Sequence, residues 1–186
     1  MNVVDDLLAQ LVTLGVNDVA HMTGDLRKHL RGTFERLQVW DCPEELCVAG
    51  LFHAVYGTYG SADALVGLDK RPDIAEIIGK RAEEMVYIYA ACDRPHFYPR
   101  VVRDDQPQYL DRFTSDAVVL TDDNLSSFCE LTLANELDVF ASNGYAYLNQ
   151  YGRYYVPLFS SARFRRRLND SANAECGHFL SDVDAR

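Results

Sequence analysis

Long apolar runs are missing from this chain of 186 residues, and positive charge is scarce. No apolar run approaches the roughly 20 residues of a membrane-spanning helix, and the N-terminus carries Asp5 and Asp6 where a signal peptide needs Lys or Arg. Lys and Arg number 18 against 28 Asp and Glu, which gives a net charge of -10. Such a charge repels nucleic acids and anionic lipids. We therefore expect a cytoplasmic protein whose partner is a small molecule, not a nucleic acid or a membrane; a homodimer is left open.

Basic clusters and paired cysteines are also scarce. One basic cluster stands near the C-terminus, and we expect it to be the solvated face of a late helix: Arg163, Arg165, Arg166 and Arg167. The five cysteines include no pair with the short spacing of a zinc knuckle or a redox motif. We expect them to be reduced and mostly buried thiols.

Helical periodicity dominates the chain, whose 48% apolar content is that of an ordinary globular protein. We expect a mainly all-α protein that forms a single domain over residues 1–186, a helical bundle with its core at about 20–140. A tyrosine-rich C-terminal extension covers 143–186. The stretch 95–121 holds three of the six prolines, so we predict a small hairpin or an ordered loop there instead of a helix.

The individual helices follow from the spacing of apolar residues and from capping signals. Asp41 can cap a helix that has Pro43 in its first turn, and Gly79 separates a short helix from a longer one. The expected helices cover residues 3–14, 25–40, 41 to about 55, a short stretch from 72, 80–92 and, after Asp122-Asp123-Asn124, 125–139.

Two histidines stand on neighbouring predicted helices, and antiparallel packing would bring them together. His29 lies on the second helix and His53 at the end of the third. Imidazole is a strong ligand for zinc, iron or manganese, and a shared ion requires ring nitrogens within about 4 Å of each other. The alternative is a core histidine bonded to a backbone carbonyl. His21, about two turns before His29, is a third candidate ligand, and His96 could reach over as a lid.

Four segments support a family resemblance: His29-Leu30, Ala49 to His53, "IIGKRAEEMVYIYAACDR" and "LTLANELD". Their order and spacing over residues 20–140 resemble the HD-domain superfamily of metal-dependent phosphohydrolases, in particular its alarmone-hydrolase-like branch. The third-helix segment is similar to an uncharacterised HD-like subfamily with the motif GLFHxxYGT. The resemblance implies an HD-domain-like helical bundle and a divalent metal (Fe, Mn or Zn).

The resemblance also assigns the metal ligands. His29 matches the first histidine of the superfamily and His53 the histidine of the paired motif. Ala54 and Asn135 stand where the superfamily has aspartates, so the acidic positions are degenerate and Asn135 could contribute only a neutral amide oxygen. The acidic pair of the alarmone hydrolases would fall near Gly57 and Thr58, where there is no carboxylate.

Several further residues are candidates for substrate binding. Arg81 or Arg94 could clamp an anion, and Tyr56 could line a pocket or belong to the core. Gly57 and Thr58 could present a backbone N–H and a hydroxyl to a substrate, or Gly57 could simply end the helix. We expect the nearby acids to lie at the surface: Glu83, Glu84 and Asp138.

Three functions remain open from the sequence. The first is a divergent HD-type metal-dependent enzyme of the hydrolase kind, in which the ion activates water on a small polar or phosphorylated metabolite. The second is a degenerate HD-like module without metal that binds or senses a small molecule. The third is an HD-type iron oxygenase, which needs more carboxylates than the matched positions supply. Metal content separates the first from the second.

Overall fold

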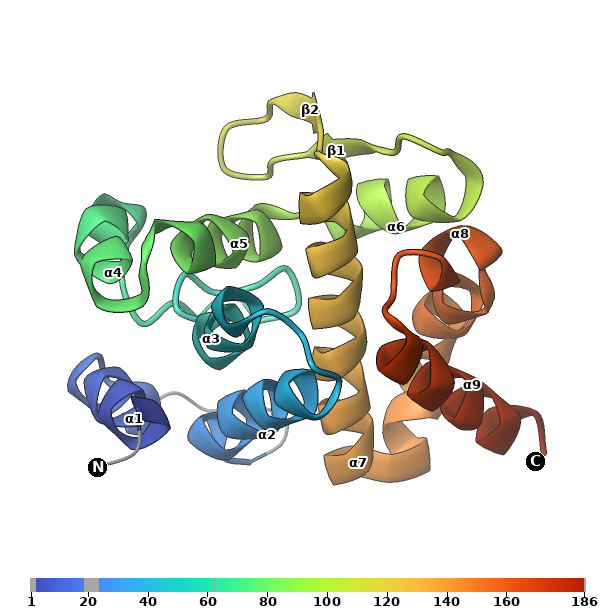
Figure 1. Cartoon of the computed structure of the whole chain (residues 1–186), viewed down its shortest axis with the longest axis horizontal. Coiled ribbons are helices and arrows are strands. Elements are labelled where there is room, and N and C mark those ends of the chain that lie inside the picture. Colours follow the sequence, from blue (N-terminus) through green and yellow to red (C-terminus); the bar gives the residue numbers. More distant parts are fainter. Residues whose placement is uncertain (1–2, 19–23, 62, 186) are drawn as a thin grey trace.

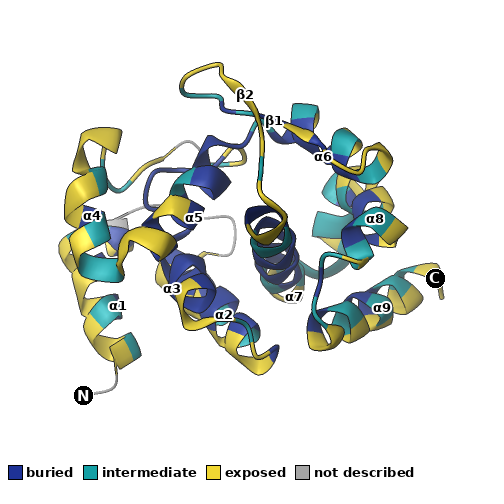
Figure 2. Cartoon of the chain, turned by 45° about the horizontal axis from the view of Figure 1, so that its top comes forward, coloured by how far each residue is buried: buried dark blue, intermediate teal, exposed yellow. Residues whose placement is uncertain are grey.

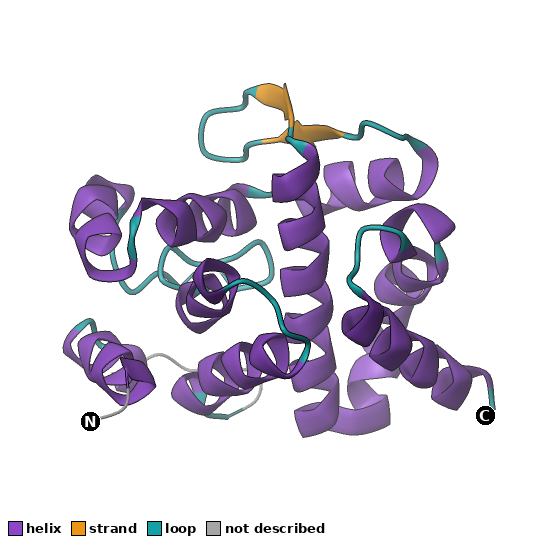
Figure 3. Ribbon diagram, viewed as in Figure 1, coloured by secondary structure: helices purple, strands orange, loops and turns teal. Residues whose placement is uncertain are grey.

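The architecture is mainly α-helical, as the periodicity predicts, with one small hairpin (Figure 3). The computed structural model describes residues 3–18, 24–61 and 63–185. In chain order the elements are α1 (Val3–Thr13), η1 (Val16–Asp18), α2 (Leu26–Val39), α3 (Glu44–Phe52), η2 (Leu68–Lys70), α4 (Arg71–Ile78), α5 (Lys80–Ala91), α6 (Arg94–Arg103), β1 (Gln108–Leu110), β2 (Ala117–Val119), α7 (Asp122–Ser160), α8 (Ala162–Arg165) and α9 (Asp170–Asp184). No helix in these ranges is both long and apolar enough to cross a membrane.

Helix α7 runs through the middle of the molecule, with α1 to α5 on one side and α8 and α9 on the other (Figure 1). It contacts α2, α3, α5, α6, α8 and α9. The buried residues make up all of α3 after its first two residues and the inner faces of α2, α5 and α7 (Figure 2). The core therefore surrounds α7, and side chains from distant parts of the sequence meet on its surface.

The approach of α2 to α7 is close enough to require a glycine. A Cβ atom on Gly32 would lie 2.1 Å from Oδ1 of Asp138. Asp25 caps α2 by accepting a hydrogen bond from the backbone N–H of Lys28 at 3.0 Å. Gly32 lies one turn after His29, so this close contact sets His29 against α7.

Helix α7 changes direction at Gly144, whose φ of 58° and ψ of -144° lie outside the helical region. A side chain is rarely tolerated at such a φ, whereas glycine adopts it readily. The kink turns the C-terminal half of α7 back, so that the Tyr147 hydroxyl donates a short hydrogen bond to Glu136, eleven residues earlier. The tyrosine-rich segment is therefore a helix that faces the first half of α7.

The expectation for residues 95–121 is half right. The antiparallel hairpin forms, with Gln108 opposite Val119, but residues 94–103 form α6 where a loop or hairpin was expected. Pro95 occupies the first turn, where its missing N–H has no intrahelical partner to lose. The spacing of Phe97, Tyr98 and Val101 is helical, and all three are buried. The proline count obscured this pattern.

The C-terminal elements are tied to the core by polar as well as apolar contacts. Trp40 is 2% exposed, and its indole N–H donates to Oε2 of Glu175 on α9 at 2.6 Å. The arginines after α7 pair with acids: Arg163 and Arg166 with Asp105, and Arg167 with Asp122. The basic cluster is thus a partly exposed face whose four positive charges are offset in part by two aspartates.

All five cysteines are free thiols, as expected, and four of them are buried. Burial raises the pKa of Cys42 to about 12 and that of Cys47 to about 11. Both side chains are therefore unreactive thiols at neutral pH.

Phe159 provides a test of the C-terminal packing. Its ring is 1% exposed and lies 5.2 Å from Phe164 and 6.1 Å from Phe179, centroid to centroid. We expect Phe159→Ala to cost about 3–5 kcal/mol of unfolding free energy and to lower the melting temperature by roughly 6–20 °C. Tyr154→Ala, at a position 52% exposed, is the control and should change stability by less than about 0.5 kcal/mol. Equal melting temperatures for the two variants would contradict this packing.

Candidate functional site

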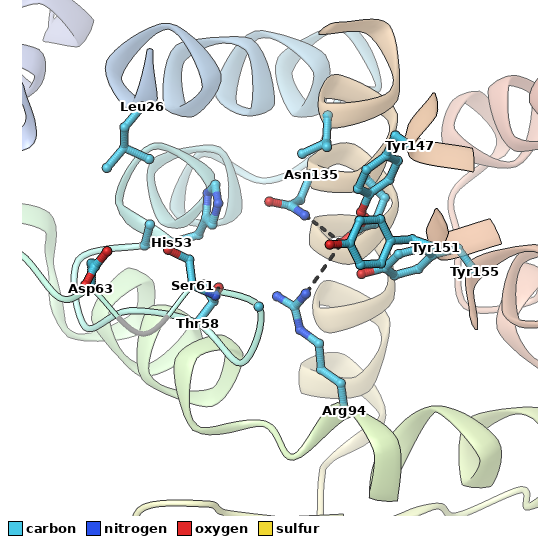
Figure 4. A pocket seen from close by; sticks show the side chains of 14 residues that line it. Leu26, His53, Thr58, Ser61, Asp63, Arg94, Asn135, Tyr147, Tyr151 and Tyr155 are labelled. Carbon is cyan, nitrogen blue, oxygen red and sulfur yellow. Dashed lines mark hydrogen bonds and ion pairs between the residues drawn. The ribbon is translucent and has the colours of Figure 1, made fainter. Parts of the chain in front are cut away.

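A cavity of about 210 Å³ opens beside the middle of α7 (Figure 4). One wall comes from the end of α3 and the turn that follows it, the opposite wall from α7, and Arg94 at the start of α6 reaches in between (Figure 4). The lining residues are Leu26, His53, Ala54, Thr58, Gly60, Ser61, Asp63, Arg94, Asn135, Glu136, Val139, Tyr147, Tyr151 and Tyr155.

His29 and His53 meet next to this cavity, as their spacing predicts. Their ring centroids are 5.1 Å apart and their planes are nearly perpendicular, at 87°. Nδ1 of His53 lies 2.7 Å from the carbonyl oxygen of Gly50. A carbonyl can only accept, so Nδ1 of His53 carries a proton. His53 thus makes the backbone bond of a core histidine and also lines the cavity.

Both ring nitrogens of His29 face oxygen atoms. Nδ1 lies 2.7 Å from Oδ2 of Asp138, and Nε2 lies 3.1 Å from Oδ1 of Asn135. The orientation of the Asn135 amide follows from its other contact, because its NH₂ group donates to Oε1 of Glu136 at 2.8 Å. A doubly protonated imidazole satisfies both bonds of His29. His29 therefore belongs to a continuous hydrogen-bonded chain from Asp138 to Glu136.

Glu136 is a buried carboxylate, 3% exposed, at the end of this chain. It accepts from Asn135 and Tyr147, and its Oε1 lies 3.5 Å from Nη1 of Arg94. Burial raises the pKa of Glu136, while Arg94 and the tyrosines oppose the shift. The pKa values of Tyr147 and Tyr155 are also raised, first by burial and then by Glu136. Both hydroxyls therefore remain protonated donors.

Arg94 is the buried cation of the site. Its side chain is 10% exposed, and its guanidinium carbon lies 5.0 Å from the centre of the Tyr89 ring. Nε has no hydrogen-bond partner within the described ranges. A Cβ on Gly60 would lie 3.9 Å from Nη1, so the glycine leaves space in front of the guanidinium. The guanidinium points into the cavity, toward α7 (Figure 4).

Aromatic residues from the second half of α7 form the remaining wall. Tyr147, Tyr151 and Tyr155 recur every four residues and share one helix face. The rings of Tyr147 and Tyr151 are 4.8 Å apart, and those of Tyr147 and Tyr155 are 6.2 Å apart and stacked. The spacing of four was visible in the sequence, but the kink at Gly144 that aims this face at Glu136 was not.

The turn after His53 is ordered by its own hydrogen bonds. Gly57 has a φ of 69°, and its N–H donates to Ala54 at the end of the helix. The N–H of Thr58 donates to the carbonyl of Ser61 at 2.6 Å. Thr58 lines the cavity with its side chain but uses its N–H within the turn, so Gly57 acts mainly as the helix terminator.

Two predicted binding residues lie elsewhere. Arg81 is exposed and pairs with Glu84 at 3.1 Å, away from the cavity lining. Tyr56 is buried, and its hydroxyl donates to Glu83 at 3.0 Å. His96 is half-buried on α6 and does not line the cavity. His21 lies outside the described residues.

The expectation of a surface position is wrong for Glu83, whereas Asp138 is half-buried. Glu83 is 5% exposed and receives two hydrogen bonds from Arg71, at 2.6 and 3.0 Å. The Asp138 side chain is 18% exposed and contacts His29. The buried Glu83 has the guanidinium of Arg71 from another helix to compensate its charge, and the half-buried Asp138 has the imidazole of His29. Such partners cannot be identified from spacing along a single helix.

The described residues do not fit a divalent ion. In residues 3–18, 24–61 and 63–185, no three His, Cys, Asp or Glu side chains are placed to hold a metal. Both ring nitrogens of His29 are engaged by Asp138 and Asn135, and Ala54 offers no ligand. Where a metal ion was expected from the resemblance, the chain places hydrogen bonds between its own side chains.

Comparisons with known proteins give one match. Residues 10–94 match the model of a domain of unknown function, DUF6817. This segment contains His29, His53, Thr58 and Arg94 but ends before α7. No curated protein and no solved structure matches the chain. The match therefore includes one wall of the cavity and leaves its chemistry open.

Glu136 yields a prediction on the pH dependence of stability. Because its folded-state pKa is raised above the ordinary 4.5, wild-type stability should fall as pH rises from about 4.5 through the folded value. Glutamine cannot ionise, so the Glu136→Gln variant should not lose stability in this way. The difference in unfolding free energy, variant minus wild type, should therefore increase with pH over this window. Urea unfolding from pH 4.5 to 8 measures the difference.

The control for this experiment is Glu84→Gln, because the Glu84 side chain is 49% exposed. Glu84→Gln makes the same change from carboxylate to amide, but at an exposed position. The test is the slope of this free-energy difference against pH. The absolute value of the difference is not diagnostic, because Glu136→Gln also loses the ion pair with Arg94. A difference for Glu136→Gln that stays flat or falls with pH would contradict the assignment.

Proposed function

We propose that this protein binds a small metabolite with a carboxylate group in the cavity beside Arg94, without a metal ion. The carrying observation is the incomplete pairing of Arg94, which has five N–H donors but one acceptor, Glu136 at 3.5 Å, within the described ranges. A guanidinium with unmet donors is costly in a buried site. A carboxylate ligand would supply the missing acceptors in a bidentate geometry.

The surroundings of Arg94 favour a single negative charge on the ligand. Glu136 already offsets part of the guanidinium charge, and a dianion would meet stronger repulsion from it. A monoanion carries half the charge of a dianion and is repelled less by the Glu136 carboxylate. Thr58 and Ser61 line the wall of the cavity that faces α7, and their hydroxyls could orient a polar ligand.

Arg94→Met and Arg81→Met form a matched pair that tests this function. We expect wild type to bind acetate, propionate or butyrate in calorimetry, and Arg94→Met to lose about 10- to 100-fold in affinity, the contribution of a charged hydrogen bond. Arg81→Met, whose residue lies outside the cavity, should bind like the wild type. Inorganic phosphate should bind more weakly than the carboxylates.

Equal binding by the two variants would overturn the proposal. If Arg94→Met fails to fold because Glu136 loses its cationic partner, the Arg94→Lys variant is used in place of Arg94→Met. Lysine keeps the charge but loses the planar fork, so a bidentate carboxylate should still bind less tightly.

An HD-type metal-dependent hydrolase is the second candidate function. The contact between His29 and His53, with centroids 5.1 Å apart, is the observation that favours it. The lost carboxylates at Ala54 and Asn135 weigh against it, since neutral side chains offset little of the charge of an ion. The iron oxygenase would require still more carboxylates.

Restoring the two carboxylates tests the resemblance directly. We expect wild-type protein purified without chelator to carry little iron, zinc or manganese, and Ala54→Asp/Asn135→Asp to bind zinc at about one ion per chain. Ala64→Asp, at an exposed position near the cavity, is the control for the added charge. Elemental analysis and zinc titration give the readout.

Two outcomes of this experiment would count against the assignments. Near-stoichiometric metal in the wild type that disappears in His53→Ala would contradict a metal-free function. A restored double variant that folds but binds no zinc would show that the resemblance does not extend to the ligand geometry.

A further inference from the structure

A second and larger cavity adjoins the first. It has a volume of about 680 Å³ and lies between α6 and the second half of α7. We call it the α6–α7 groove. Its lining residues are Tyr59, Gly60, Arg94, Pro95, Tyr98, Pro99, Val102, Arg103, Tyr151, Arg153, Tyr154, Tyr155, Pro157 and Leu158.

The groove and the first cavity meet at Arg94. Four residues line both of them: Gly60, Arg94, Tyr151 and Tyr155. The guanidinium, whose Nε has no hydrogen-bond partner in the described part of the chain, therefore stands at the junction between the first cavity and the larger groove. A ligand held at Arg94 has room to extend into the groove.

The lining of the groove is apolar or aromatic apart from its arginines. Its charged lining residues are Arg94, Arg103 and Arg153, and none is an acid, although the whole chain has a net charge of -10. Tyr59 and Tyr154 are large side chains left 48% and 52% exposed. This composition is complementary to a molecule with an apolar body and a negative end.

Tyr98 adds an independent observation. It is 6% exposed, lines the groove, and its hydroxyl has no hydrogen-bond partner within the described residues. Buried hydroxyls without partners are uncommon and indicate a missing water or ligand. The orphaned donors of Tyr98 and of Arg94 Nε both belong to the groove lining.

We propose that the natural ligand is an amphipathic monocarboxylate, with its carboxylate at Arg94 and an unbranched aliphatic chain of medium length in the α6–α7 groove. This inference rests on the proposed function, because it uses the same contact at Arg94. A volume of about 680 Å³ lies within the usual range for small-molecule sites.

Chain length is the variable that tests the groove. Calorimetry with acetate, butyrate, hexanoate and octanoate should show the affinity of the wild type rising by about two- to four-fold per methylene, as expected for burial of each CH₂ group. In Val102→Asp, which places a charge in the groove, the ratio of octanoate to acetate affinity should fall to nearly one. Val118→Asp, at an exposed position on β2 outside the groove, should keep the wild-type ratio.

The outcomes separate this inference from the proposed function. Acetate and butyrate binding that depends on Arg94 but gains nothing with chain length would overturn the groove assignment and leave the proposed function intact. Loss of Arg94 dependence at every length would overturn both. If Val102→Asp does not fold, Tyr59→Asp makes the same change at an exposed groove position.

Two further measurements can overturn the inference. Octanol that binds as tightly as octanoate would mean that the groove is apolar surface without a carboxylate site. Analytical sedimentation gives the oligomeric state. A dimer for the wild type and a monomer for Val102→Asp would mean that a second copy of the chain covers the groove.

Discussion

The buried hydrogen-bonded chain along α7 is the interaction on which the site depends. Asp138, Asn135 and Glu136 lie on one helix, and their partners come from elsewhere: His29 from α2, Arg94 from α6 and Tyr147 from beyond the kink. Charges are costly in the interior unless each finds its partner. This requirement fixes α2, α6 and both halves of α7 relative to one another, and the cavity is the space left between them.

Much of the fold could be predicted because helical spacing is a local property of the sequence. The helix that contains His29 and the helix that ends at His53 form where expected, and the packing of α2 against α3 brings the two rings together. Helix α6 was missed because its prolines indicate a loop when position within the helix is ignored. The core of the structure is more predictable than its connections, because apolar periodicity indicates packing directly.

The site could be predicted only in part. Arg94 was a candidate anion clamp and does line the cavity, but the roles of Glu136 and the tyrosines depend on the backbone conformation of Gly144. Single glycines carry no indication of whether they bend a helix. The partners of Glu136 lie far apart in the sequence, and hydrogen bonds between distant elements leave no periodic signal. The matched family segment, residues 10–94, ends before the tyrosine wall.

The contact between Trp40 and Glu175 has a practical consequence for spectroscopy. The chain contains one tryptophan, and its buried indole N–H bonds to α9. The wavelength of indole emission depends on the polarity and hydrogen bonding around the ring, and buried indoles normally keep a partner for their N–H. Tryptophan emission, excited at wavelengths where the eleven tyrosines do not absorb, therefore has a single source, located where the last helix docks. Undocking of α9 can be followed optically without a label, separately from the far-ultraviolet signal of the remaining helices.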